Sequence, residues 1–338
     1  MTWVSRPRVP QQAPTTVSLF GNTDEKTLLS EVLGLLAAAK EMVVLCSFLM
    51  ASREIGRAAG EAASRGVRVY VLTSAEAALS DSRWFLTESD LAQQAKHREA
   101  LHELSQVARV RSAPNWHTKF VVVDPRTNPQ GVLLSANLNS QALRSSPELG
   151  VRLSKAEVRT FFEIARAAFW SAASEIREGV WSNSPRHRDV APPGTQSDII
   201  STINSPSAVL TRLQAQLQNA DKVVLTTYSV DRASPVLNML KRLAKHGSSI
   251  TIVCHPSPNN ATSLQQLARS GCTVLGVNWL HAKLLDAGGD DVLMVSQNLD
   301  VASNKPRLET AMTLHDQRAD DARAWLDYWI KSAEWVMQ

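Results

Sequence analysis

Two histidines in this chain have the same set of neighbours in sequence, and the set could act on a phosphate. Each is followed two residues later by a lysine and, further along, by a serine, an asparagine and a glutamate. The first set is His117, Lys119, Ser135, Asn137 and Glu148, and the second is His281, Lys283, Ser296, Asn298 and Glu309. One imidazole can attack phosphorus while another protonates the leaving group. The doubled set therefore predicts one shared site for phosphodiester chemistry.

The remaining polar residues of each set suit the same reaction. Side chains recur on one face of a strand at every second residue, so a hairpin carrying the set would bring its members together. The lysines and asparagines, supported by Ser135 and Ser296, are expected to bind the non-bridging oxygens of a phosphodiester and its transition state. Each glutamate is expected to hydrogen-bond one histidine and fix its tautomer. Two lysines acting together can replace a divalent cation, so we expect neither a metal nor a cofactor.

The repeat extends beyond these residues and determines the expected fold. Helix-period segments at 28–39 and 209–220 lead into apolar strands at 42–48 and 222–228. A second helix and strand follow in each half, then the strand pair with the polar set, then a closing helix rich in aromatic residues. Strands that alternate with helices favour an α/β sandwich. We therefore predict two tandem α/β sandwich lobes that pack as a pseudo-dimer with one shared active site.

Four segments are expected along the chain. Residues 1–16 form an N-terminal extension, 17–181 the first lobe, 182–206 a linker rich in Pro, Ser and Asn, and 207–338 the second lobe. The first lobe carries an insertion at about 75–110 that the second lacks. The charged part of this insertion has helical spacing, which predicts either a solvated surface helix or a lid over the site.

Composition sets broad limits on the class of protein. The 44% hydrophobic and 20% charged residues are ordinary for a soluble globular protein, and a net charge of +4 permits a polyanionic partner without requiring one. The three cysteines have no metal-ligand spacing and fit a reducing compartment. No signal peptide is expected at the N-terminus, and the longest apolar run, 42–51, is too short to span a bilayer. We therefore expect a cytoplasmic protein without integral membrane association.

The other histidines and the tryptophans receive simpler interpretations. Six histidines lack the lysine, asparagine and glutamate partners and are expected on the surface or in the core: His97, His102, His187, His246, His255 and His315. Trp116 is adjacent to His117 and is expected in the core. Trp279 lies two residues before His281 and is expected to form a wall of the site.

The two sets resemble the signature of the phospholipase D superfamily, HxK(x)4D followed by a GSxN-like element. His117, Lys119 and Asp124 match the first element, whereas Gly288 takes the place of the Asp in the second half, and both halves lack the Gly before Ser. The resemblance covers about residues 17–338 and implies phospholipase D-like lobes, with a mainly structural role for Asp124. It also implies a metal-independent, two-step mechanism through a phosphohistidine, with His117 as nucleophile and His281 as general acid and then base.

Members of this family act on several kinds of substrate, so three hypotheses stay open. The first is a phosphodiesterase that cleaves nucleic acid, preferably DNA, in a bacterial defence or DNA-processing system with protein partners of a multi-gene system. The second is a phospholipase D-type lipid phosphodiesterase or phosphatidyl transferase, for which residues 83–85 (Arg-Trp-Phe) are the candidate membrane contact. The third is a nucleic-acid-binding subunit that a partner activates. A monomer suffices for the site because both sets are on one chain, and a homodimer stays open.

Overall fold

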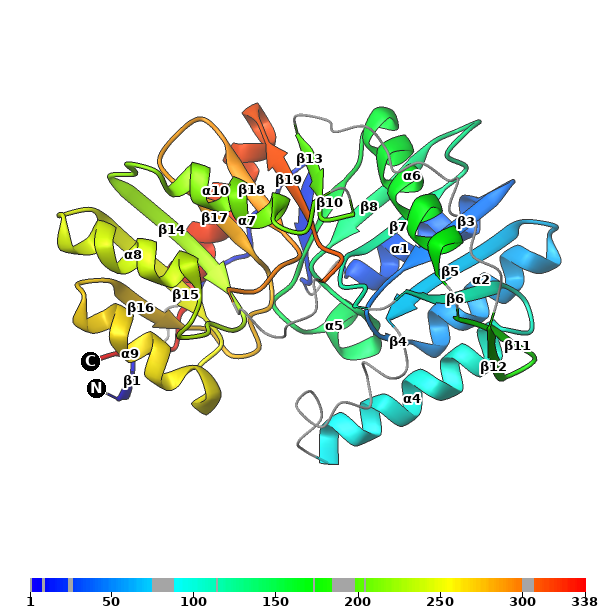
Figure 1. Ribbon diagram of the computed structural model, residues 1–338, viewed down its shortest axis with the longest axis horizontal. Helices are drawn as coiled ribbons and strands as arrows, with labels where there is room; N and C mark the ends of the chain where they lie inside the picture. The colour runs from blue at the N-terminus through cyan, green and yellow to red at the C-terminus, as the bar shows by residue number, and fades with distance from the viewer. Residues whose placement is uncertain are drawn as a thin grey trace.

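The structure is a computed structural model that describes the chain except residues 1, 8–9, 24–26, 75–87, 114, 173, 184–197, 204 and 300–306, and except the side chains of 88–91 and 259. Each half of the chain forms a nine-stranded sheet with helices on both faces, and the two halves lie side by side (Figure 1). The predicted class, a two-lobe α/β fold, is therefore confirmed.

The first half builds a mixed sheet with the strand order β12-β11-β6-β5-β3-β7-β8-β10-β2. Strands β3, β5 and β6 run parallel, and β7, β8, β10 and β2 are added antiparallel. In chain order the elements are β2 (Leu19–Gly21), α1 (Leu28–Ala38), β3 (Met42–Cys46), β4 (Met50–Ala51), α2 (Arg53–Ser64), β5 (Arg68–Ser74), α4 (Glu88–Leu104), β6 (Arg109–Ala113), β7 (Lys119–Val123), β8 (Gln130–Leu134), β9 (Leu138–Asn139), α5 (Ser140–Arg144), β10 (Leu149–Arg152), α6 (Lys155–Ser171), β11 (Ser174–Arg177) and β12 (Val180–Asn183).

The second half repeats this plan with the order β1-β20-β16-β15-β14-β17-β18-β19-β13. Its elements are β13 (Ile199–Ser201), α7 (Ala208–Leu217), β14 (Lys222–Thr227), α8 (Pro235–Lys245), β15 (Ser249–Cys254), η1 (Pro258–Asn260), α9 (Ala261–Arg269), β16 (Thr273–Gly276), β17 (Leu284–Asp286), β18 (Val292–Val295), β19 (Thr310–Leu314), α10 (Asp316–Ser332) and β20 (Trp335–Met337), with β1 (Trp3–Ser5) from the N-terminus.

Two edge strands fall in segments that the sequence assigned to neither lobe. Strand β1 lies in the predicted extension and pairs with β20, so the two chain ends meet at one edge of the second sheet (Figure 1). Strand β13 lies in the predicted linker and pairs with β19. Both segments therefore contribute a strand to the second sheet, while the first two residues of the predicted linker, 182–183, end β12 of the first sheet. The four proposed segment boundaries stay predictions.

Local sequence explains where several helices begin and end. The side chains of Thr27 and Ser154 accept hydrogen bonds from the third residues of α1 and α6, which completes a capping box in each case. After α2 and α8 the chain turns at Gly66 and Gly247, with φ of 88° and 97°. Glycine adopts this left-handed conformation without steric cost, as expected at a helix C-terminus.

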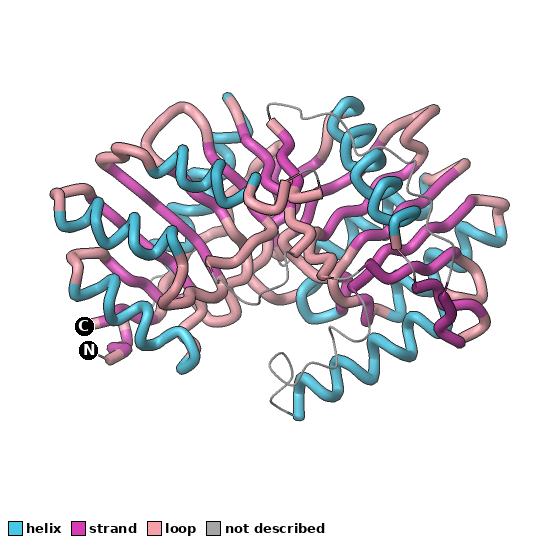
Figure 2. The backbone as a smooth tube through the Cα atoms, in the orientation of Figure 1, coloured by secondary structure: helices cyan, strands magenta, loops and turns pink. Residues whose placement is uncertain are grey.

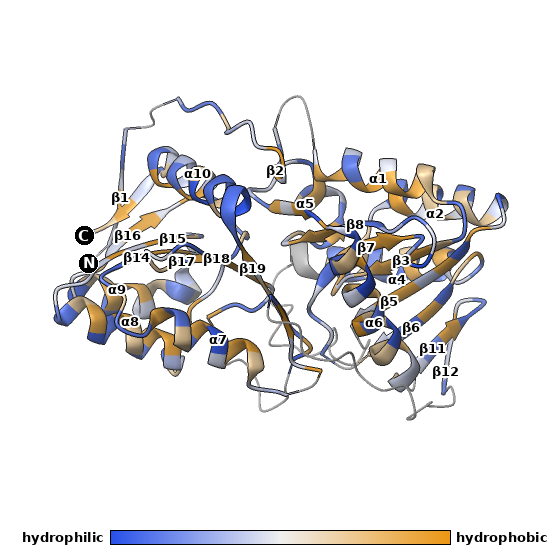
Figure 3. Ribbon diagram, turned by 90° about the horizontal axis from the view of Figure 1, so that it is seen from above, coloured by the Kyte–Doolittle hydropathy of each residue, from blue (hydrophilic) through white to orange (hydrophobic). Residues whose placement is uncertain are grey.

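The strands are apolar on both faces, and their side chains belong to three hydrophobic cores. All five residues of β3 are buried; Val43 and Leu45 pack under the helices of the first half, while Met42, Val44 and Cys46 face the other way. That second face belongs to a core shared by both halves, which also contains α6 and α10. Figure 3 shows the strands coloured mainly as hydrophobic between helices that are hydrophilic on their outer sides. The two sheets are therefore packed together through a hydrophobic core that both halves contribute to.

Asp124 fixes the turn that follows β7. Its buried carboxylate accepts hydrogen bonds from the backbone N–H groups of Lys40, Glu41 and Met42, at 2.8–2.9 Å. These bonds tie the start of β3 to the end of β7, at the end of the strands away from His117. In the second half Gly288 takes the matching position with φ of 79° and no carboxylate, and Asp286 instead pairs with Arg323 of α10 at 3.3 Å. The contacts support the structural role expected for Asp124.

The insertion contains α4, which packs on α2 and β4. Ala100, Leu101 and Leu104 are buried, and so is His97, whose Nδ1 accepts a hydrogen bond from the N–H of Met50 at 2.9 Å. The described part of this helix is thus a surface helix with one packed face. Residues 83–85, which carry the predicted membrane contact, lie outside the described residues.

Candidate active site

The candidate residues lie at or just beyond strand ends. Loops of the two halves meet at the centre of the molecule (Figure 2). Strands β7 and β8 pair antiparallel, as do β17 and β18, so the two predicted hairpins are present. His117 lies just before β7, which begins at Lys119, and Lys283 lies just before β17. Ser135 and Ser296 directly follow β8 and β18. Each hairpin therefore brings its histidine and lysine close to its serine and asparagine.

Each histidine is held by the glutamate of the opposite half. His117 Nδ1 lies 3.0 and 3.1 Å from the two carboxylate oxygens of Glu309, and His281 Nδ1 lies 2.9 Å from Oε1 of Glu148. A carboxylate at Nδ1 favours the tautomer with the proton on Nδ1, which leaves the lone pair on Nε2. Neither half could therefore orient its own histidine without the other.

The lysines of the same half face the second ring nitrogen. Lys119 Nζ lies 3.2 Å from Nε2 of His117, and Lys283 Nζ lies 3.3 Å from Nε2 of His281 and donates to its carbonyl at 2.8 Å. An ammonium group has only donors, so these contacts agree with an unprotonated Nε2 on both rings. The site therefore contains two imidazole Nε2 atoms, each next to a lysine ammonium group.

The two serines contact the glutamates, which adds a positioning role to the one expected for them. Ser135 Oγ donates to Glu148 and Ser296 Oγ donates to Glu309. Both hydroxyls also accept from a backbone N–H, that of Leu149 at 2.8 Å and that of Thr310 at 2.9 Å. These contacts place each serine where it can orient the carboxylate that orients a histidine. The phosphate-binding role of the serines stays a prediction.

The two asparagines lie beyond the same strand ends. Asn137 Oδ1 accepts from the N–H of Leu49 at 3.4 Å and contacts Oγ of Ser47 at 3.5 Å, so the loop after β3 orients its amide. Asn298 is buried at the equivalent position of the second half. With Oδ1 of Asn137 turned to the loop, its NH₂ group is the donor left for a ligand.

Burial dominates the electrostatics of both imidazoles. It lowers the pKa of His117 to about 3, against the opposing effect of Glu309 and together with the charge of Lys119. Burial also lowers the pKa of His281, with Glu148 opposing and Lys283 adding to the decrease. Both rings are therefore neutral near pH 7 in the free protein, which a nitrogen nucleophile requires.

The glutamates stay ionised although they are buried. Burial alone would raise the pKa of Glu309, but His117 and Lys119 bring it down to about 2. The pKa of Glu148 is lowered against burial by His281 and Lys283. Both groups are therefore carboxylates at neutral pH.

Two lysines share the centre of the site. Lys119 and Lys283 are 1% and 2% exposed, and burial and the charge of Lys283 lower the pKa of Lys119. A bound anion would relieve this repulsion and stabilise both ammonium groups. The centre is therefore built to receive negative charge.

Backbone hydrogen bonds also lock the halves together at the site. His117 N donates to Leu308 O at 3.0 Å, and Leu308 N donates to Asn115 O at 3.0 Å. In the second half His281 N donates to Pro147 O at 3.1 Å. Each histidine segment is thus clamped by the segment that carries the partner glutamate, which limits how far the paired groups can separate.

Arg307 is a charged neighbour that the sequence comparison missed. It lies close enough to His117 and Lys119 to contribute to lowering the pKa of both. Its counterpart in the first half, two residues before the glutamate, is Ser146. Searching for residues that repeat in both halves could not find it, since it occurs in one half alone.

Aromatic side chains contact both histidines, and the sequence predicted only part of these contacts. Phe48 contacts His117 edge-on at 5.5 Å between ring centroids, and Tyr228 contacts His281 in the same manner at 5.1 Å. His255, expected to be an ordinary surface or core residue, stacks between Tyr228 and Trp279. The sequence could not predict this contact because the stack joins three segments that are far apart in sequence.

The structure also shows which residues of the two halves correspond around Trp116 and Trp279. Counted from the histidines, Asn115 matches Trp279, and both have φ of 61°. Trp116 matches Leu280, and both are buried beside a histidine. The shared Asn-Trp sequence is therefore offset by one residue: Trp116 is in the core as predicted, and Trp279 is at the surface near the site.

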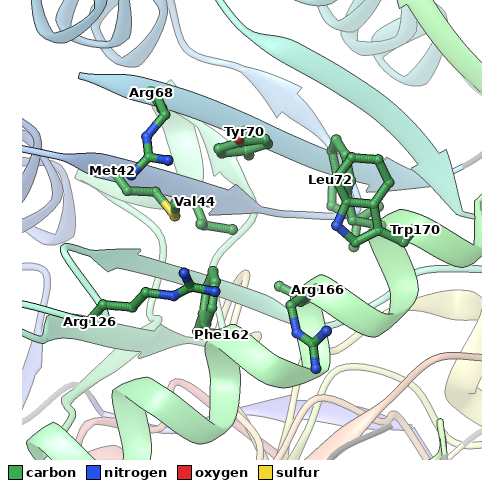
Figure 4. Close-up of a pocket in the computed structure, with 11 residues that line it drawn as sticks. Met42, Val44, Arg68, Tyr70, Leu72, Arg126, Phe162, Arg166 and Trp170 are labelled. Atoms are coloured by element: carbon green, nitrogen blue, oxygen red, sulfur yellow. The ribbon is translucent and has the colours of Figure 1, made fainter. Parts of the chain in front are cut away.

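Three further observations concern the rest of the molecule. Within the described residues, no group of three or more His, Cys, Asp or Glu is placed to hold a metal ion, and no helix has the length and apolar character needed to cross a membrane. A cavity of about 190 Å³ lies between α6 and strands β3 and β5, lined by apolar side chains with Arg68, Arg126 and Arg166 (Figure 4). Its strand residues include the first residues of β3 and β5, at the opposite end from His117.

Comparisons with known proteins agree with this fold. Residues 32–170 match a family model described as "Cardiolipin synthase, PLD-like domain". Phosphatidylserine synthase of Haemophilus influenzae Rd KW20 superposes with a TM-score of 0.66 at 12% identity, covering 95% of this chain and 89% of that one. A polyphosphate kinase from Porphyromonas gingivalis superposes with a TM-score of 0.52 at 17% identity, covering 85% of this chain and 45% of that one.

A third structure, the phospholipase D family member Nuc from Salmonella typhimurium, aligns at 18% identity with a TM-score of 0.37, over 47% of this chain and 98% of that one. No curated protein matches the sequence. Members of the phospholipase D superfamily, to which the matched model belongs, are phosphodiesterases and phosphotransferases. Residues 32–170 of this chain are therefore similar to a domain of that superfamily.

Proposed function

We propose that this protein is a metal-independent phosphodiesterase that works through a phosphohistidine at His117. The observation that carries the proposal is the crosswise pairing: two neutral imidazoles, each with a carboxylate of the other half at Nδ1 and a lysine at Nε2. This arrangement supplies a nucleophile, a proton donor and charge stabilisation in one buried place.

The first step transfers the phosphoryl group to His117. The lone pair on Nε2 attacks phosphorus, the bond to the leaving oxygen breaks, and that oxygen takes the proton of a protonated His281. The negative charge of a bound phosphodiester favours the protonated form of His281, whose side chain is 17% exposed, compared with 8% for His117. Glu309 stabilises the positive charge that develops on His117 during attack.

The second step returns the enzyme to its starting state. His281, now neutral, removes a proton from water, and the water oxygen attacks phosphorus while the P–N bond breaks and its electron pair returns to His117. Lys119, Lys283 and the amide groups of Asn137 and Asn298 hold the non-bridging oxygens in both steps, as fixed donors do in an oxyanion hole.

For the substrate, we propose single-stranded nucleic acid, preferably DNA. The mildly basic charge of the chain and the exposed indole beside the site support this class. The alternative is a lipid phosphodiester, which the description of the matched family model suggests. The clearest difference between the two classes is the leaving group, because a nucleotide presents an aromatic base near the scissile bond.

The test is cleavage of end-labelled single-stranded and double-stranded DNA in excess EDTA, by the wild type and by the variants His117→Ala and His281→Ala. We expect cleavage in EDTA that is lost in both variants. Quenching with an alkaline denaturant during turnover should trap the phosphoryl group on the protein in an acid-labile, base-stable form that is absent from His117→Ala. Cleavage that needs a divalent metal, or that survives both substitutions, would overturn the proposal.

A further inference from the structure

Trp279 is an unusual residue in an unusual conformation. Its φ is 61°, in the left-handed region that bulky side chains avoid, and its side chain is 57% exposed. Such strained positions cluster at functional sites. It lies two residues before His281, so whatever contacts its ring is close to the site.

The ring of Trp279 is the outer member of a stack of three. It lies 5.0 Å from the ring of His255 with an interplanar angle of 17°, and His255 lies 5.4 Å from Tyr228 with an angle of 13°. The backbone N–H of Trp279 donates to His255 Nδ1 at 3.1 Å, which fixes the two residues relative to each other. Burial lowers the pKa of His255, so its ring is neutral at pH 7.

The stack connects the solvent to His281. Tyr228, its inner member, meets His281 edge-on at 5.1 Å with an interplanar angle of 70°. Because His255 covers one face of the indole, the exposed area of Trp279 is mainly its other face. The result is a flat aromatic surface, open on one side and rigidly supported on the other, next to the proposed proton donor.

Within the described residues, the first half lacks the outer ring of this stack. Phe48 contacts His117 as Tyr228 contacts His281, but Asn115 occupies the position of Trp279, and asparagine accepts the left-handed conformation at low cost. The same backbone is therefore available without an aromatic residue. The tryptophan is not needed for the turn, which points to a ligand.

We infer that the Trp279–His255–Tyr228 stack is a subsite for one nucleobase, that of the nucleotide on the leaving-group side of the scissile phosphate. The inference rests on the proposed function. It adds that the base on the leaving-group side of the scissile phosphate is recognised, and that it is recognised by stacking. Nucleobases stack on exposed aromatic rings with little regard to sequence. His281 protonates the leaving oxygen, so the nucleoside that carries this oxygen lies on the side of the stack.

The test uses a substrate with one cleavable bond. A thymidine tetranucleotide with neutral methylphosphonate linkages has a phosphodiester only at its centre, and two further versions lack the base on one or the other side of that bond. Trp279→Asn places the residue of the first half at the same backbone position, so this variant should fold. Trp279→Phe keeps a ring, and Trp181→Ala removes a partly buried indole from β12, at the far edge of the first sheet.

We expect Trp279→Asn to raise KM for the intact substrate roughly 5- to 150-fold, the loss of one base–aromatic stack, with kcat nearly unchanged. Removing the base on the leaving-group side should raise the wild-type KM by a similar factor, and Trp279→Asn should then add less than about twofold. Trp279→Phe should recover most of the affinity, and Trp181→Ala should behave as wild type. Fluorescence anisotropy of oligonucleotide binding by His117→Ala should give the same pattern without turnover.

Three results would overturn the inference. Equal losses by Trp279→Asn on the intact and both abasic substrates would mean that the indole has a structural role, and no loss at all would mean that no base stacks there. Either result leaves the phosphodiesterase proposal standing, since the wild type still cleaves. A wild type that cleaves none of the oligonucleotides but hydrolyses a short-chain phosphatidylcholine would instead overturn both the stack and the nucleic-acid substrate.

Discussion

Replacing Glu309 by glutamine should slow formation of the covalent intermediate, whereas Glu148→Gln should slow its breakdown. The reason is the crosswise pairing, in which Glu309 supports His117 and Glu148 supports His281. Glutamine is nearly isosteric with glutamate but offers one acceptor oxygen where the carboxylate offers two. At Glu309, both the ring of His117 and the hydroxyl of Ser296 need an acceptor, so glutamine cannot satisfy both.

The size of the effect follows from the interactions of Glu309. Its pKa falls from the ordinary value of 4.5 to about 2 in spite of burial, through His117 and Lys119. That difference corresponds to about 3 kcal/mol in favour of the carboxylate. If the same interaction stabilises the positive charge that develops on His117, its loss slows attack by about 100-fold. Wrong-tautomer populations would add to this figure.

The assay is rapid mixing with bis(p-nitrophenyl) phosphate in EDTA. Its leaving group departs without protonation, so the first step does not need His281. Glu148→Gln should release one equivalent of nitrophenolate per active site at nearly the wild-type rate and then continue about 100-fold more slowly. Glu309→Gln should show no burst and a slow release throughout. Circular dichroism and the urea midpoint confirm that both variants are folded.

The reverse pattern, a burst with Glu309→Gln and none with Glu148→Gln, would assign the nucleophile to His281 and refute the proposed roles. Changes below threefold in both variants would refute the argument that the carboxylates orient and charge the imidazoles. A burst in the wild type alone would mean that the two glutamates act on the same step.

Three further predictions concern stability, each measured by urea unfolding. Asp124→Asn should lower the free energy of unfolding by about 1–3 kcal/mol, since one amide oxygen cannot accept the three backbone N–H groups, whereas Asp286→Asn should cost less; equal effects would refute this. Burial lowers the pKa of His97 from 6.5 to about 4, so as the pH falls the unfolded state binds a proton before the folded state does. His97 therefore contributes about 3 kcal/mol of stability above pH 6.5, which is lost as the pH falls from 6.5 to 4, and His97→Gln should flatten that pH dependence. Trp325→Ala should cost about 3–5 kcal/mol, because the indole of α10 fills the space above Gly21 of β2 and joins the halves; a cost below 1 kcal/mol would contradict this.

Much of the fold could be predicted because both halves repeat the same local signals. Apolar runs such as 42–48 and 222–228 are recognisable as buried strands, and Gly66 and Gly247 mark two helix ends. The edge strands could not be predicted. Strands β1 and β13 are three residues each, and what makes them strands is a partner that lies more than a hundred residues away.

The candidate site also has features that the sequence predicts and features that it does not. The residues of the doubled set were recognisable from sequence because they occur twice at matching places. Which glutamate orients which histidine depends on the packing of one half against the other, and no spacing within a half contains that information. The serines, assigned to the phosphate, contact the glutamates because the strand ends turn their hydroxyls toward β10 and β19.

The differences between the halves carry the most functional information. Two identical subunits could form the crosswise pairs, but they would present the same residue on both sides of the phosphate. On one chain, Arg307 can stand near His117 where the other half has Ser146, and Trp279 can stand near His281 where the other half has Asn115. A cation beside one imidazole and an aromatic stack beside the other make the two sides of the site unequal. We expect an unequal site to bind a phosphodiester in one direction, so that in the proposed mechanism the same histidine attacks and the same histidine protonates in every turnover.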